Sequence, residues 1–390
     1  MKCTPIIVHF CPCYVDFDRE TGGVANVVRQ ICLGLIERKM EVQIICGNRE
    51  LGVKKSEPGV YRKKDGLTVH VISQRGHPLL GPVGSLKPLI KTITRPSIAH
   101  VHTCFSAFTE QAMAQLELER ISFVFTPHGK LSDTFLDQHR REKMLWWRLW
   151  GRRAVSGASR IVLGSKGEAS AFPQLGLTGG FSIVPNGFDA HLCEQARRID
   201  SRLINEPYIL YLGYLDPRKQ PELLVRAFAV SESRKSHKLV IVGPDSYNHR
   251  AAVEEEIRRV GMGESVLLYG PAHGLEKWQL LSSATCFCLP SRGEGMPIAL
   301  CEAVGAGLPL VISRECNFDE AFEAGAAIMP EDFDEIKWAK AIDQICLSSE
   351  NRKHMAQNAL NLSDKFKWEN IVQQWIEVYN KVAIEERRNG

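Results

Sequence analysis

The chain has 390 residues, of which 44% are hydrophobic and 24% are charged, and its formal net charge is +4 at pH 7. These values are ordinary for globular proteins, the length suits two domains better than one core, and so weak a charge does not indicate a nucleic-acid-binding protein. No hydrophobic run approaches the roughly 20 residues that a spanning helix needs, so we expect any membrane contact to be peripheral.

Short hydrophobic runs alternate with amphipathic helical patterns, which is typical of parallel α/β sheets covered on both faces. The first run, residues 5–10, leads through a loop to a predicted helix over residues 24–38. The further strands that we predict in the first half are residues 42–46, 69–73, 98–102, 123–126, 160–164 and 182–184.

Two features of the first half follow predicted strands, where ligands bind in open parallel sheets. Gly22 and Gly23 join the first strand and its loop to a helix, and small residues there let backbone N–H groups approach a phosphate, although such a pair is more often only a turn. His128 follows the run 123–125 and is expected either to face a ligand or to be structural. For His102 a site role is less expected.

Residues 138–153 combine arginines and lysine with Trp146, Trp147 and Trp150. Basic helices that carry tryptophan bind anionic membrane surfaces, so this segment is a candidate membrane contact. The alternative is a helix that packs its tryptophans into the first domain and leaves its cations in water.

The second half begins after a polar segment, residues 186–207, which has no clear strand and which we predict to connect two domains. The strand pattern starts again at residues 208–213. The further strands predicted there are residues 238–242, 266–269, 286–289 and 310–312.

Arg218 and Lys219 follow the strand at 208–213 and precede a helix, so they are placed to meet an anion. By themselves they would be explained as solvated surface cations. Together with a helix N-terminus elsewhere in the same domain, they are expected to neutralise a diphosphate.

That helix N-terminus is predicted in the stretch from Glu294 to Glu302, which places two carboxylates around the start of a helix. Gly295 and Pro297 precede the hydrophobic run 298–304, so we predict a turn followed by a helix with Pro297 at its first position. The first N–H groups of a helix have no internal partner and carry the positive end of its dipole, which suits them to a phosphate.

The twelve cysteines are scattered, and several lie inside strand-like runs, so we expect a reduced, cytoplasmic protein without a signal peptide. Cys11 and Cys13 lack a second cysteine or histidine pair at zinc spacing. We therefore predict loop cysteines there and no metal site.

Together these residues resemble glycosyltransferase family 4, the retaining nucleotide-sugar enzymes of the GT-B fold, over nearly the whole chain. The spacing of Glu294 and Glu302 is the most specific part of the resemblance, and the glycine pair is the least. The matching motifs are Gly22-Gly23, Thr126-Pro-His-Gly129, Val184-Pro-Asn-Gly187 with Asp189, residues 213–219, residues 239–243, Leu289-Pro-Ser291 and residues 294–302.

The resemblance implies an α/β fold of two Rossmann-like parallel-sheet domains that face each other across a cleft. The first domain would span residues 1–187, on the acceptor side, and a C-terminal helix over residues 368–390 would cross back to complete it. The second domain, residues 205–367, would bind the nucleotide sugar.

The resemblance also implies roles for individual residues, with Glu294 and His128 as the catalytic candidates. Glu294 would contact hydroxyls of the donor sugar, Glu302 the ribose, and His128 the sugar. The other expected substrate-binding residues are Gly23, Asn186, Arg218, Lys219, Gly295, Met296, Pro297 and Ile298, most of them at the diphosphate. No metal or other cofactor is expected, because cations and helix dipoles would neutralise the diphosphate.

Two positions depart from the family pattern: Tyr214 stands where arginine is usual, and Gln220 where glycine is common. The loss of one guanidinium at a diphosphate should weaken leaving-group stabilisation by ~2–4 kcal/mol unless Arg218 compensates.

We therefore expect a cytoplasmic, retaining glycosyltransferase that moves a sugar from a nucleotide diphosphate sugar to a glycan acceptor. Residues 138–153 suggest a lipid-linked acceptor at the inner face of an anionic membrane, as in surface polysaccharide assembly. Two alternatives stay open. One is a nucleotide-sugar epimerase or hydrolase of similar architecture, and the other is a non-catalytic homologue that only binds sugar nucleotides.

Overall fold

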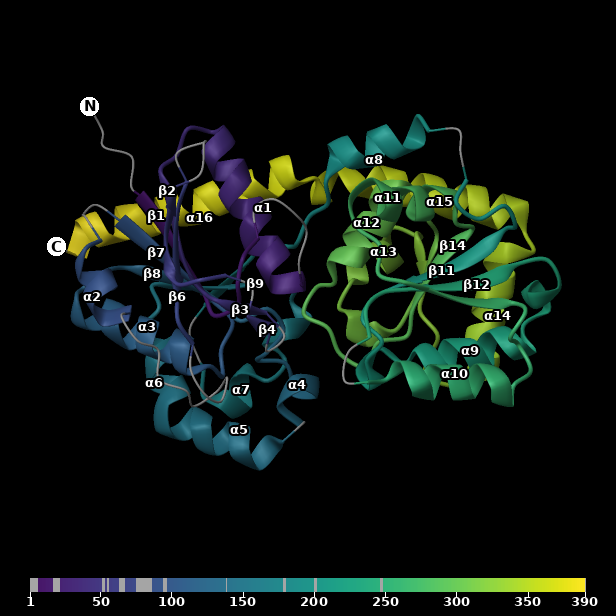
Figure 1. The fold of residues 1–390 in the computed structure, drawn as a ribbon, viewed down its shortest axis with the longest axis horizontal. Coiled ribbons are helices and arrows are strands. Elements are labelled where there is room, and N and C mark those ends of the chain that lie inside the picture. Colours follow the sequence, from purple (N-terminus) through teal and green to yellow (C-terminus); the bar gives the residue numbers. More distant parts are fainter. Residues whose placement is uncertain are drawn as a thin grey trace. The chain divides into compact units, whose positions relative to one another are not determined.

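The computed structural model describes residues 6–16, 22–50, 53–54, 56–62, 67–74, 86–93, 97–137, 139–177, 180–199, 202–245 and 248–389. It consists of two compact units. Unit 1 comprises Met1–Pro185 and Trp368–Gly390, and unit 2 comprises Asn186–Lys367 (Figure 1).

Unit 1 contains an eight-stranded sheet in the order β10-β9-β8-β7-β1-β2-β6-β5. All neighbouring strands are parallel except β5, which pairs antiparallel with β6 at the edge. The strands are β1 (Ile6–Cys11), β2 (Val42–Gly47), β5 (Gly59–Arg62), β6 (Thr68–Ile72), β7 (Ser97–His102), β8 (Phe123–Thr126), β9 (Arg160–Leu163) and β10 (Phe181–Ile183).

The seven parallel strands of unit 1 confirm the predicted pattern, whereas three short strands were not predicted. The side chains of β5 are all exposed, so no hydrophobic alternation marks it. The other two are β3 (Arg49–Glu50) and β4 (Val53–Lys54), which form a separate two-stranded antiparallel ladder.

Helices cover both faces of the unit 1 sheet. α1 (Gly23–Glu37) and α16 (Trp368–Asn389) pack against each other over β1, β2, β7 and β8, and α3 (Ala107–Leu118) packs against β1 and β7. Gly34 of α1 permits the close approach of α16, because a Cβ there would press on the side chain of Val372. The C-terminal helix thus belongs to unit 1, as expected. The remaining α-helices of unit 1 include α2 (Leu86–Lys91), α4 (Asp133–Asp137), α5 (Arg140–Trp146), α6 (Arg152–Ser156) and α7 (Phe172–Leu175).

Unit 2 contains a fully parallel six-stranded sheet in the order β13-β12-β11-β14-β15-β16. Five of its strands were predicted, and β16, which has only two residues, was too short to recognise. The strands are β11 (Tyr208–Leu212), β12 (Lys238–Val242), β13 (Val266–Gly270), β14 (Cys286–Leu289), β15 (Leu310–Ile312) and β16 (Ala327–Ile328).

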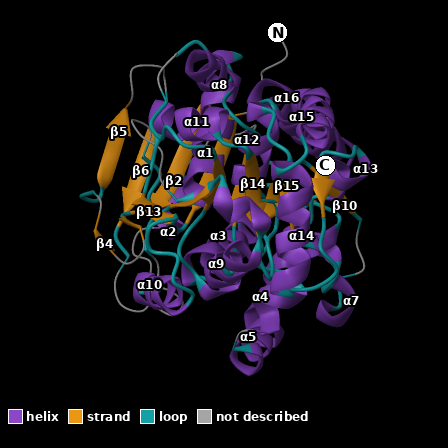
Figure 2. Cartoon of the chain, turned by 90° about the vertical axis from the view of Figure 1, so that its right-hand side faces the viewer, coloured by secondary structure: helices purple, strands orange, loops and turns teal. Residues whose placement is uncertain are grey.

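Helices also enclose the sheet of unit 2 (Figures 1 and 2). On one side lie α9 (Pro221–Val230), α10 (Arg250–Arg259) and α14 (Glu335–Cys346). On the other side lie α8 (Ala190–Arg197), α11 (Gly274–Ser283), α12 (Ile298–Ala306) and α15 (Ser349–Ser363), and the short α13 (Asp319–Glu323) follows β15. Both units therefore have the two-sided parallel architecture that the sequence predicts.

Two local features differ from the sequence prediction. The segment predicted as a connection contains α8, whose Cys193 and Ala196 are buried in the core of unit 2. With so few hydrophobic residues facing the core, the helix was not recognisable. Pro297 caps α12 in an extended conformation, so that the helix begins at Ile298, one residue later than predicted.

Candidate functional site

The polar residues that follow the strands of unit 2 meet at one edge of its sheet. The Lys219 ammonium lies 2.6 Å from Glu294 Oε1, although the two residues are 75 positions apart. Lys219 ends the turn η3 (Pro217–Lys219) after β11, and Glu294 lies in the loop after β14. Both side chains are 17% exposed, so a ligand can reach a cation and a carboxylate at the same place.

The loop that carries Glu294 is fixed on several sides. Ser291 donates a hydrogen bond of 2.7 Å to Glu294 Oε1. The Glu294 N–H donates to the carbonyl oxygen of Glu315, and the Asn317 side-chain amide donates to the carbonyl oxygen of Glu294 at 2.6 Å. The carboxylate is thus held in place before any ligand arrives, as a preorganised site requires.

Gly243 brings the ends of β11 and β12 together beside this loop. Its φ of +149° is unfavourable for other residues, and a Cβ there would overlap the carbonyl oxygen of Gly213. The Gly213 N–H in turn donates to Val242 O at 2.9 Å. Only glycine fits at position 243.

The guanidinium of Arg218 is paired with Asp216 within the same turn. Its Nη2 donates to Asp216 Oδ2 at 2.6 Å, and its Nε lies 3.1 Å from Asp216 Oδ1. Burial alone would raise the pKa of Asp216, but the hydrogen bonds from Arg218 outweigh burial and lower it. Asp216 therefore neutralises the guanidinium charge of Arg218, which we had predicted from the sequence to meet an anion. The role of Arg218 at a phosphate stays a prediction.

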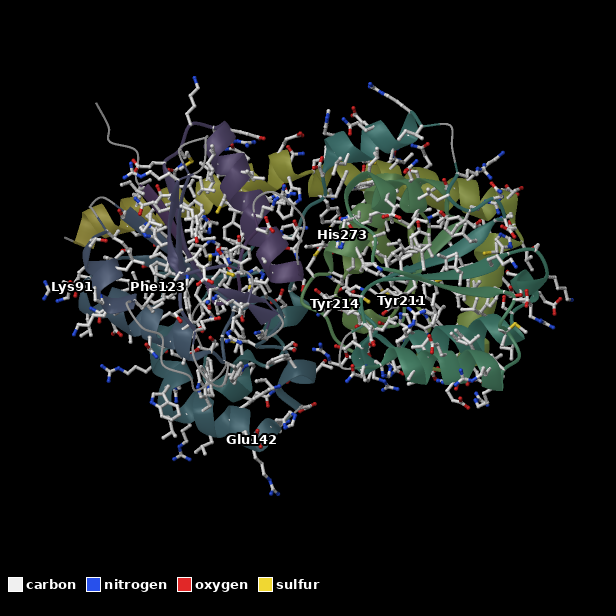
Figure 3. The ribbon with its side chains drawn as sticks, viewed as in Figure 1. Lys91, Phe123, Glu142, Tyr211, Tyr214 and His273 are labelled. Carbon is white, nitrogen blue, oxygen red and sulfur yellow. The ribbon has the colours of Figure 1, made fainter. Side chains whose placement is uncertain are left out.

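The two departures from the family pattern lie on either side of Lys219. The carbonyl oxygen of Tyr214 accepts a 2.7 Å hydrogen bond from the hydroxyl of buried Tyr211 (Figure 3). Gln220 has φ 53° and ψ 44°, a left-handed conformation that glycine adopts more easily. The backbone at position 220 thus has the conformation that glycine favours, and glutamine adopts it at a higher conformational free energy.

Glu294 is followed by Gly295, Met296 and Pro297, which lead into α12 at Ile298. The Asn186 side-chain amide donates to the Met296 carbonyl oxygen at 2.6 Å. Asn186 therefore holds the loop before α12. Its expected direct contact with substrate is untested, but this bond makes it a positioning residue for the helix N-terminus.

Glu302 forms a buried ion pair that the sequence did not predict. Its Oε1 lies 2.6 Å from the ammonium of Lys277 on α11, and the two side chains are 7% and 8% exposed. Glu302 is thus fixed in place at the second turn of α12. Its predicted contact with a ribose stays a prediction.

In unit 1, Gly23 is the first residue of α1 and Gly22 caps the helix without a side-chain hydrogen bond. Gly23 is exposed, and a Cβ there would meet no atom within 4 Å. Packing within the described residues therefore does not require glycine at position 23. This leaves room for a ligand at the start of α1.

His128 belongs to a cluster of four histidines in unit 1, which we call the histidine cluster: His9, His100, His102 and His128. His102 Nδ1 lies 3.0 Å from His128 Nε2, and His102 Nε2 lies 2.9 Å from His9 Nδ1. His100 bonds instead to the Tyr379 hydroxyl at 2.8 Å and the Thr126 hydroxyl at 2.9 Å.

The loop that carries His128 is pinned by a buried carboxyl group. Glu168 accepts hydrogen bonds from the N–H groups of Gly129, at 2.8 Å, and Gly164, at 2.9 Å. His128 itself has φ +52° and Gly129 has φ +78°, so two successive residues are left-handed. A histidine in this conformation is strained, and such strain is typical of functional sites.

The histidine cluster is uncharged at neutral pH. Burial lowers the pKa of His9 to about 3, and burial, followed by the nearby Lys130, lowers that of His128 to about 3. Burial and the neighbouring histidines lower the pKa values of His100 and His102 well below the usual 6.5. His128 is thus suited to a neutral hydrogen bond, not to titration near pH 7.

We expect unit 1 to lose stability as the pH falls below 6.5. Below this pH, histidines of the unfolded chain take up protons that the buried histidines do not. Each such proton lowers the free energy of unfolding by about 1.4 kcal/mol per pH unit. Glu110 and Glu168 act in the opposite sense, because burial raises their pKa values, that of Glu110 to about 8, but the histidines outnumber them. The free energy of unfolding of unit 1 should fall by at least about 1.4 kcal/mol between pH 6 and pH 5.

Hydrogen exchange of the β1 and β7 amides measures this change, and the amides of β11 and β12 in unit 2 serve as the internal reference. Equal exchange free energies for β1 and β7 at pH 6 and pH 5 would contradict the assignment of neutral, buried histidines.

His9, His100 and His102 each offer a ring nitrogen within 4.8 Å of the others, a spacing that a metal ion could bridge. All of their ring nitrogens except His9 Nε2 are engaged in hydrogen bonds with one another or with His128, Thr126 and Tyr379. Most of these nitrogens thus already have hydrogen-bond partners, and the expected absence of a metal stays a prediction.

The basic, tryptophan-bearing segment forms α5, the π-helical turn η1 (Trp147–Gly151) and α6, and Gln138 lies outside the described residues. Trp147 is 2% exposed and its indole N–H donates to Leu175 O at 3.0 Å, so this tryptophan packs into unit 1. Leu145, Leu149 and Trp150 are instead 60%, 55% and 54% exposed. Trp147 thus fits the interpretation in which tryptophan packs into the first domain, whereas Leu145, Leu149 and Trp150 fit the interpretation of a membrane contact.

The exposed side chains of this segment include several cations. Arg141, Arg148, Arg152 and Arg153 are exposed, whereas Lys143 turns inward onto the ring of Phe135. None of the helices in the described residues combines the length and hydrophobicity needed to cross a membrane.

Two family profiles match the chain, one to each half. The profile described as Glycosyltransferase Family 4 matches residues 21–192, and the profile described as Glycosyl transferases group 1 matches residues 194–362. Together they include every site residue that the sequence predicts, whereas His9 of the histidine cluster lies outside both.

Individual relatives are similar over almost the whole chain. A D-inositol 3-phosphate glycosyltransferase of Paenarthrobacter aurescens is 22% identical over 93% of this chain and 94% of that protein. A GDP-mannose:cellobiosyl-diphosphopolyprenol alpha-mannosyltransferase of Komagataeibacter xylinus is 23% identical over 96% of this chain and 93% of that protein.

A solved structure shares the fold. HepE of Anabaena in complex with UDP and glucose is 17% identical, has a TM-score of 0.71, and is matched over 96% of this chain and 99% of that chain. At this level of identity the likeness shows the shared two-sheet architecture.

Proposed function

The chain belongs to the group 1 glycosyltransferases, with a Glycosyltransferase Family 4 domain in its first half, and from this membership we propose that it transfers a sugar from a nucleotide diphosphate sugar to a glycan acceptor with retention of configuration. The observation that carries the proposal is the ion pair of Lys219 and Glu294 at the start of α12. It places a cation beside a carboxylate in the loop that leads into α12, whose N-terminus attracts anions.

Each part of this site suits one part of the donor. The ammonium of Lys219 and the first N–H groups of α12 would bind the diphosphate, because both carry positive charge. The Glu294 carboxylate would accept hydrogen bonds from sugar hydroxyls. Glu302 would hold the ribose. The printed names of similar proteins support this donor class, since HepE was solved with UDP and glucose and the Komagataeibacter enzyme is named for GDP-mannose.

The proposed transfer uses the departing diphosphate as the base. The acceptor hydroxyl loses its proton to a phosphate oxygen while its oxygen bonds to the anomeric carbon on the face that the diphosphate leaves. Glu294 is proposed as the acceptor of hydrogen bonds from sugar hydroxyls and not as the nucleophile, and Lys219 and Ser291 orient it through its Oε1. Lys219 and the helix dipole take the place that a metal would have.

Thermal protection of the purified protein by a panel of nucleotide sugars tests the donor site. We expect one donor to stabilise the protein, by ~2.7 kcal/mol when its concentration is a hundred times Kd. In Lys219→Ala the affinity for the same nucleotide should fall by ~1.5–3 kcal/mol, because a charge-assisted hydrogen bond is lost.

The matched control is Lys235→Ala, which removes an exposed lysine of the same unit that pairs with Glu232. It should leave the affinity unchanged. Protection by no nucleotide sugar, or equal affinity in the two variants, would contradict the donor site. Turnover of donor without any acceptor would instead favour the epimerase or hydrolase alternative.

We further propose a lipid-linked glycan acceptor, as in surface polysaccharide assembly, which the enzyme would meet at the inner face of an anionic membrane. The exposed Leu145, Leu149 and Trp150 among arginines support a peripheral membrane contact. The name of the Komagataeibacter enzyme, which specifies a diphosphopolyprenol acceptor, supports the same acceptor class.

We expect the protein to bind anionic liposomes at low salt and to dissociate as the salt concentration rises. Replacing Arg148 and Arg153 together by glutamine should weaken binding by ~2 kcal/mol, since each basic residue near anionic lipid contributes ~1 kcal/mol. Trp150→Ser should weaken it further through lost hydrophobic contact.

Leu118→Ser is the control for Trp150→Ser, because Leu118 is 74% exposed in the same unit and lies on a different helix. Sedimentation with liposomes at low and high salt measures the effect. Absence of binding at low salt, or an equal loss in both variants, would exclude residues 139–153 as the membrane contact.

A further inference from the structure

His9, His102 and His128 form a continuous hydrogen-bonded chain, which we call the histidine chain. His9 lies on β1 and His102 ends β7, and both are completely buried. The ring planes differ by 9° between His9 and His102 and by 25° between His102 and His128. The chain thus runs from the interior of unit 1 to the loop that carries His128, by two nitrogen-to-nitrogen contacts of 2.9 and 3.0 Å.

The protons of the histidine chain are coupled. A neutral imidazole has one N–H and one bare nitrogen, so each ring can donate only once. If His9 donates to His102, then His102 must donate to His128, and the remaining proton of His128 lies on Nδ1. If the direction is reversed, His128 donates from Nε2, and its Nδ1 is a bare acceptor.

The buried end of the chain decides between these two directions. His9 Nε2 is buried and has no hydrogen-bond partner in the part of unit 1 that the structure describes. In the reversed direction this nitrogen would carry a buried N–H without an acceptor, which proteins avoid more strictly than an unpaired acceptor. The favoured arrangement therefore leaves Nε2 of His9 bare, with its proton on Nδ1.

We propose that His9 and His102 are positioning residues that fix His128 in the Nδ1–H tautomer, so that unit 1 presents a neutral N–H donor to an oxygen of the substrate. The oxygen belongs to a sugar hydroxyl or a phosphate, both of which accept such a bond. The inference rests on the proposed function in assigning that oxygen to the glycosyl donor or acceptor. It also implies that His128 does not remove a proton from the acceptor hydroxyl.

The lowered pKa values keep the three imidazoles of the histidine chain neutral around pH 7. Protonation of His102 would make both of its nitrogens donors and would end the one-directional order. Burial is the main cause of its low pKa, and His100, His128 and His9 add to it. His100 is not part of the chain, because its two nitrogens bond to Tyr379 and Thr126.

Nitrogen NMR of the full chain, labelled with ¹⁵N only in histidine, tests the tautomer at pH 7 without any substrate. We expect the His128 signals to show a protonated Nδ1 and a bare Nε2, and the His128→Gln variant identifies these signals by their loss. A proton on His128 Nε2 would overturn the inference. The NMR measurement does not depend on enzyme activity. The tautomer assignment can therefore fail while the proposed function holds, and the proposed function can fail while the tautomer assignment holds.

Variants of His102 test whether the chain acts on the reaction. His102→Leu removes both contacts, so the His128 tautomer should become mixed. The kcat should then fall several-fold with little change in nucleotide affinity, because only part of the enzyme carries the proton on Nδ1 of His128. His102→Asn should restore most of the rate, because its amide can donate from the position of Nδ1.

His100→Leu is the matched control, since it also removes a fully buried histidine of the cluster but leaves the chain intact. It should lose thermal stability as His102→Leu does, yet keep both the His128 tautomer and kcat. Equal losses of kcat in His100→Leu and His102→Leu would show a structural role alone and would overturn the inference.

Discussion

Glu294→Ala should reduce sugar transfer by ~100- to 1000-fold while leaving nucleotide affinity equal to that of the wild type or higher. The loss of rate follows from removing the acceptor for sugar hydroxyls, since one preorganised contact in a transition state is worth ~3–4 kcal/mol. The retained affinity follows from the structure. Lys219 is ion-paired with Glu294, so removing the carboxylate leaves the ammonium free to bind the diphosphate more strongly.

Steady-state kinetics and nucleotide titration of the same preparations measure both quantities. Glu294→Gln is the informative companion, because it keeps the shape and loses the charge. Glu315→Ala is the control, since Glu315 accepts from the Glu294 N–H through its carbonyl oxygen, which alanine keeps, and this variant should stay active. A Glu294→Ala enzyme with normal kcat, or with much weaker nucleotide binding, would contradict the assigned role.

Lys277→Met should destabilise unit 2 by ~3–5 kcal/mol, because it removes the ammonium group that pairs with the buried carboxylate of Glu302. Both side chains are less than a tenth exposed, so water cannot replace the lost ammonium. The loss of stability should be smaller at pH 5 than at pH 8, since the buried carboxyl group of Glu302 can take up a proton at the lower pH. Hydrogen exchange of the β14 and α11 amides measures the change in unit 2 by itself.

Lys337→Met serves as the control, because Lys337 is 43% exposed and its pairs with Glu331 and Asp332 lie at the surface. It should change stability by less than ~1 kcal/mol. The double variant Lys277→Met with Glu302→Gln should recover part of the loss. Equal effects of Lys277→Met and Lys337→Met would show that the buried pair is not a structural element of unit 2.

The strands were predictable because parallel strands buried on both faces are almost entirely hydrophobic, as in β8, β12 and β14. The same rule explains why β5 was missed, since its four side chains are exposed. The shift of the α12 start by one residue has a local cause. Proline suits both the first helical position and the cap, and only the ψ of 127° at Pro297 distinguishes them.

Part of the candidate site was also predictable, because residues after neighbouring parallel strands meet at one edge of the sheet. That rule placed Lys219 and Glu294 in the same region, but it does not specify a direct ion pair. Lys277 offered no signal, since a lysine in an amphipathic helix is usually solvated. The partner of Arg218 was adjacent in sequence and could have been found, because Asp216 stands two residues before it.

The histidine cluster could also have been found from the sequence. Residues two apart in a strand point to the same face, so His100 and His102 lie together on β7. The parallel register pairs His9 with His100, which brings the third ring onto that face. What the sequence does not show is the contact with His128, because this depends on the left-handed backbone of its loop.

The packing of α16 on α1 sets the order in which the protein can fold during synthesis. Arg38, just after α1, donates to the carbonyl oxygen of Glu369 in α16, across 331 residues of chain. Unit 2 is a single continuous segment and can fold as soon as it leaves the ribosome. Unit 1 must wait for its last helix, so its sheet stays uncovered over β7 and β8 while unit 2 is being made. The part that is made first is therefore finished last, and the face on which His9 and His100 meet Trp375 and Tyr379 of α16 stays uncovered throughout that interval.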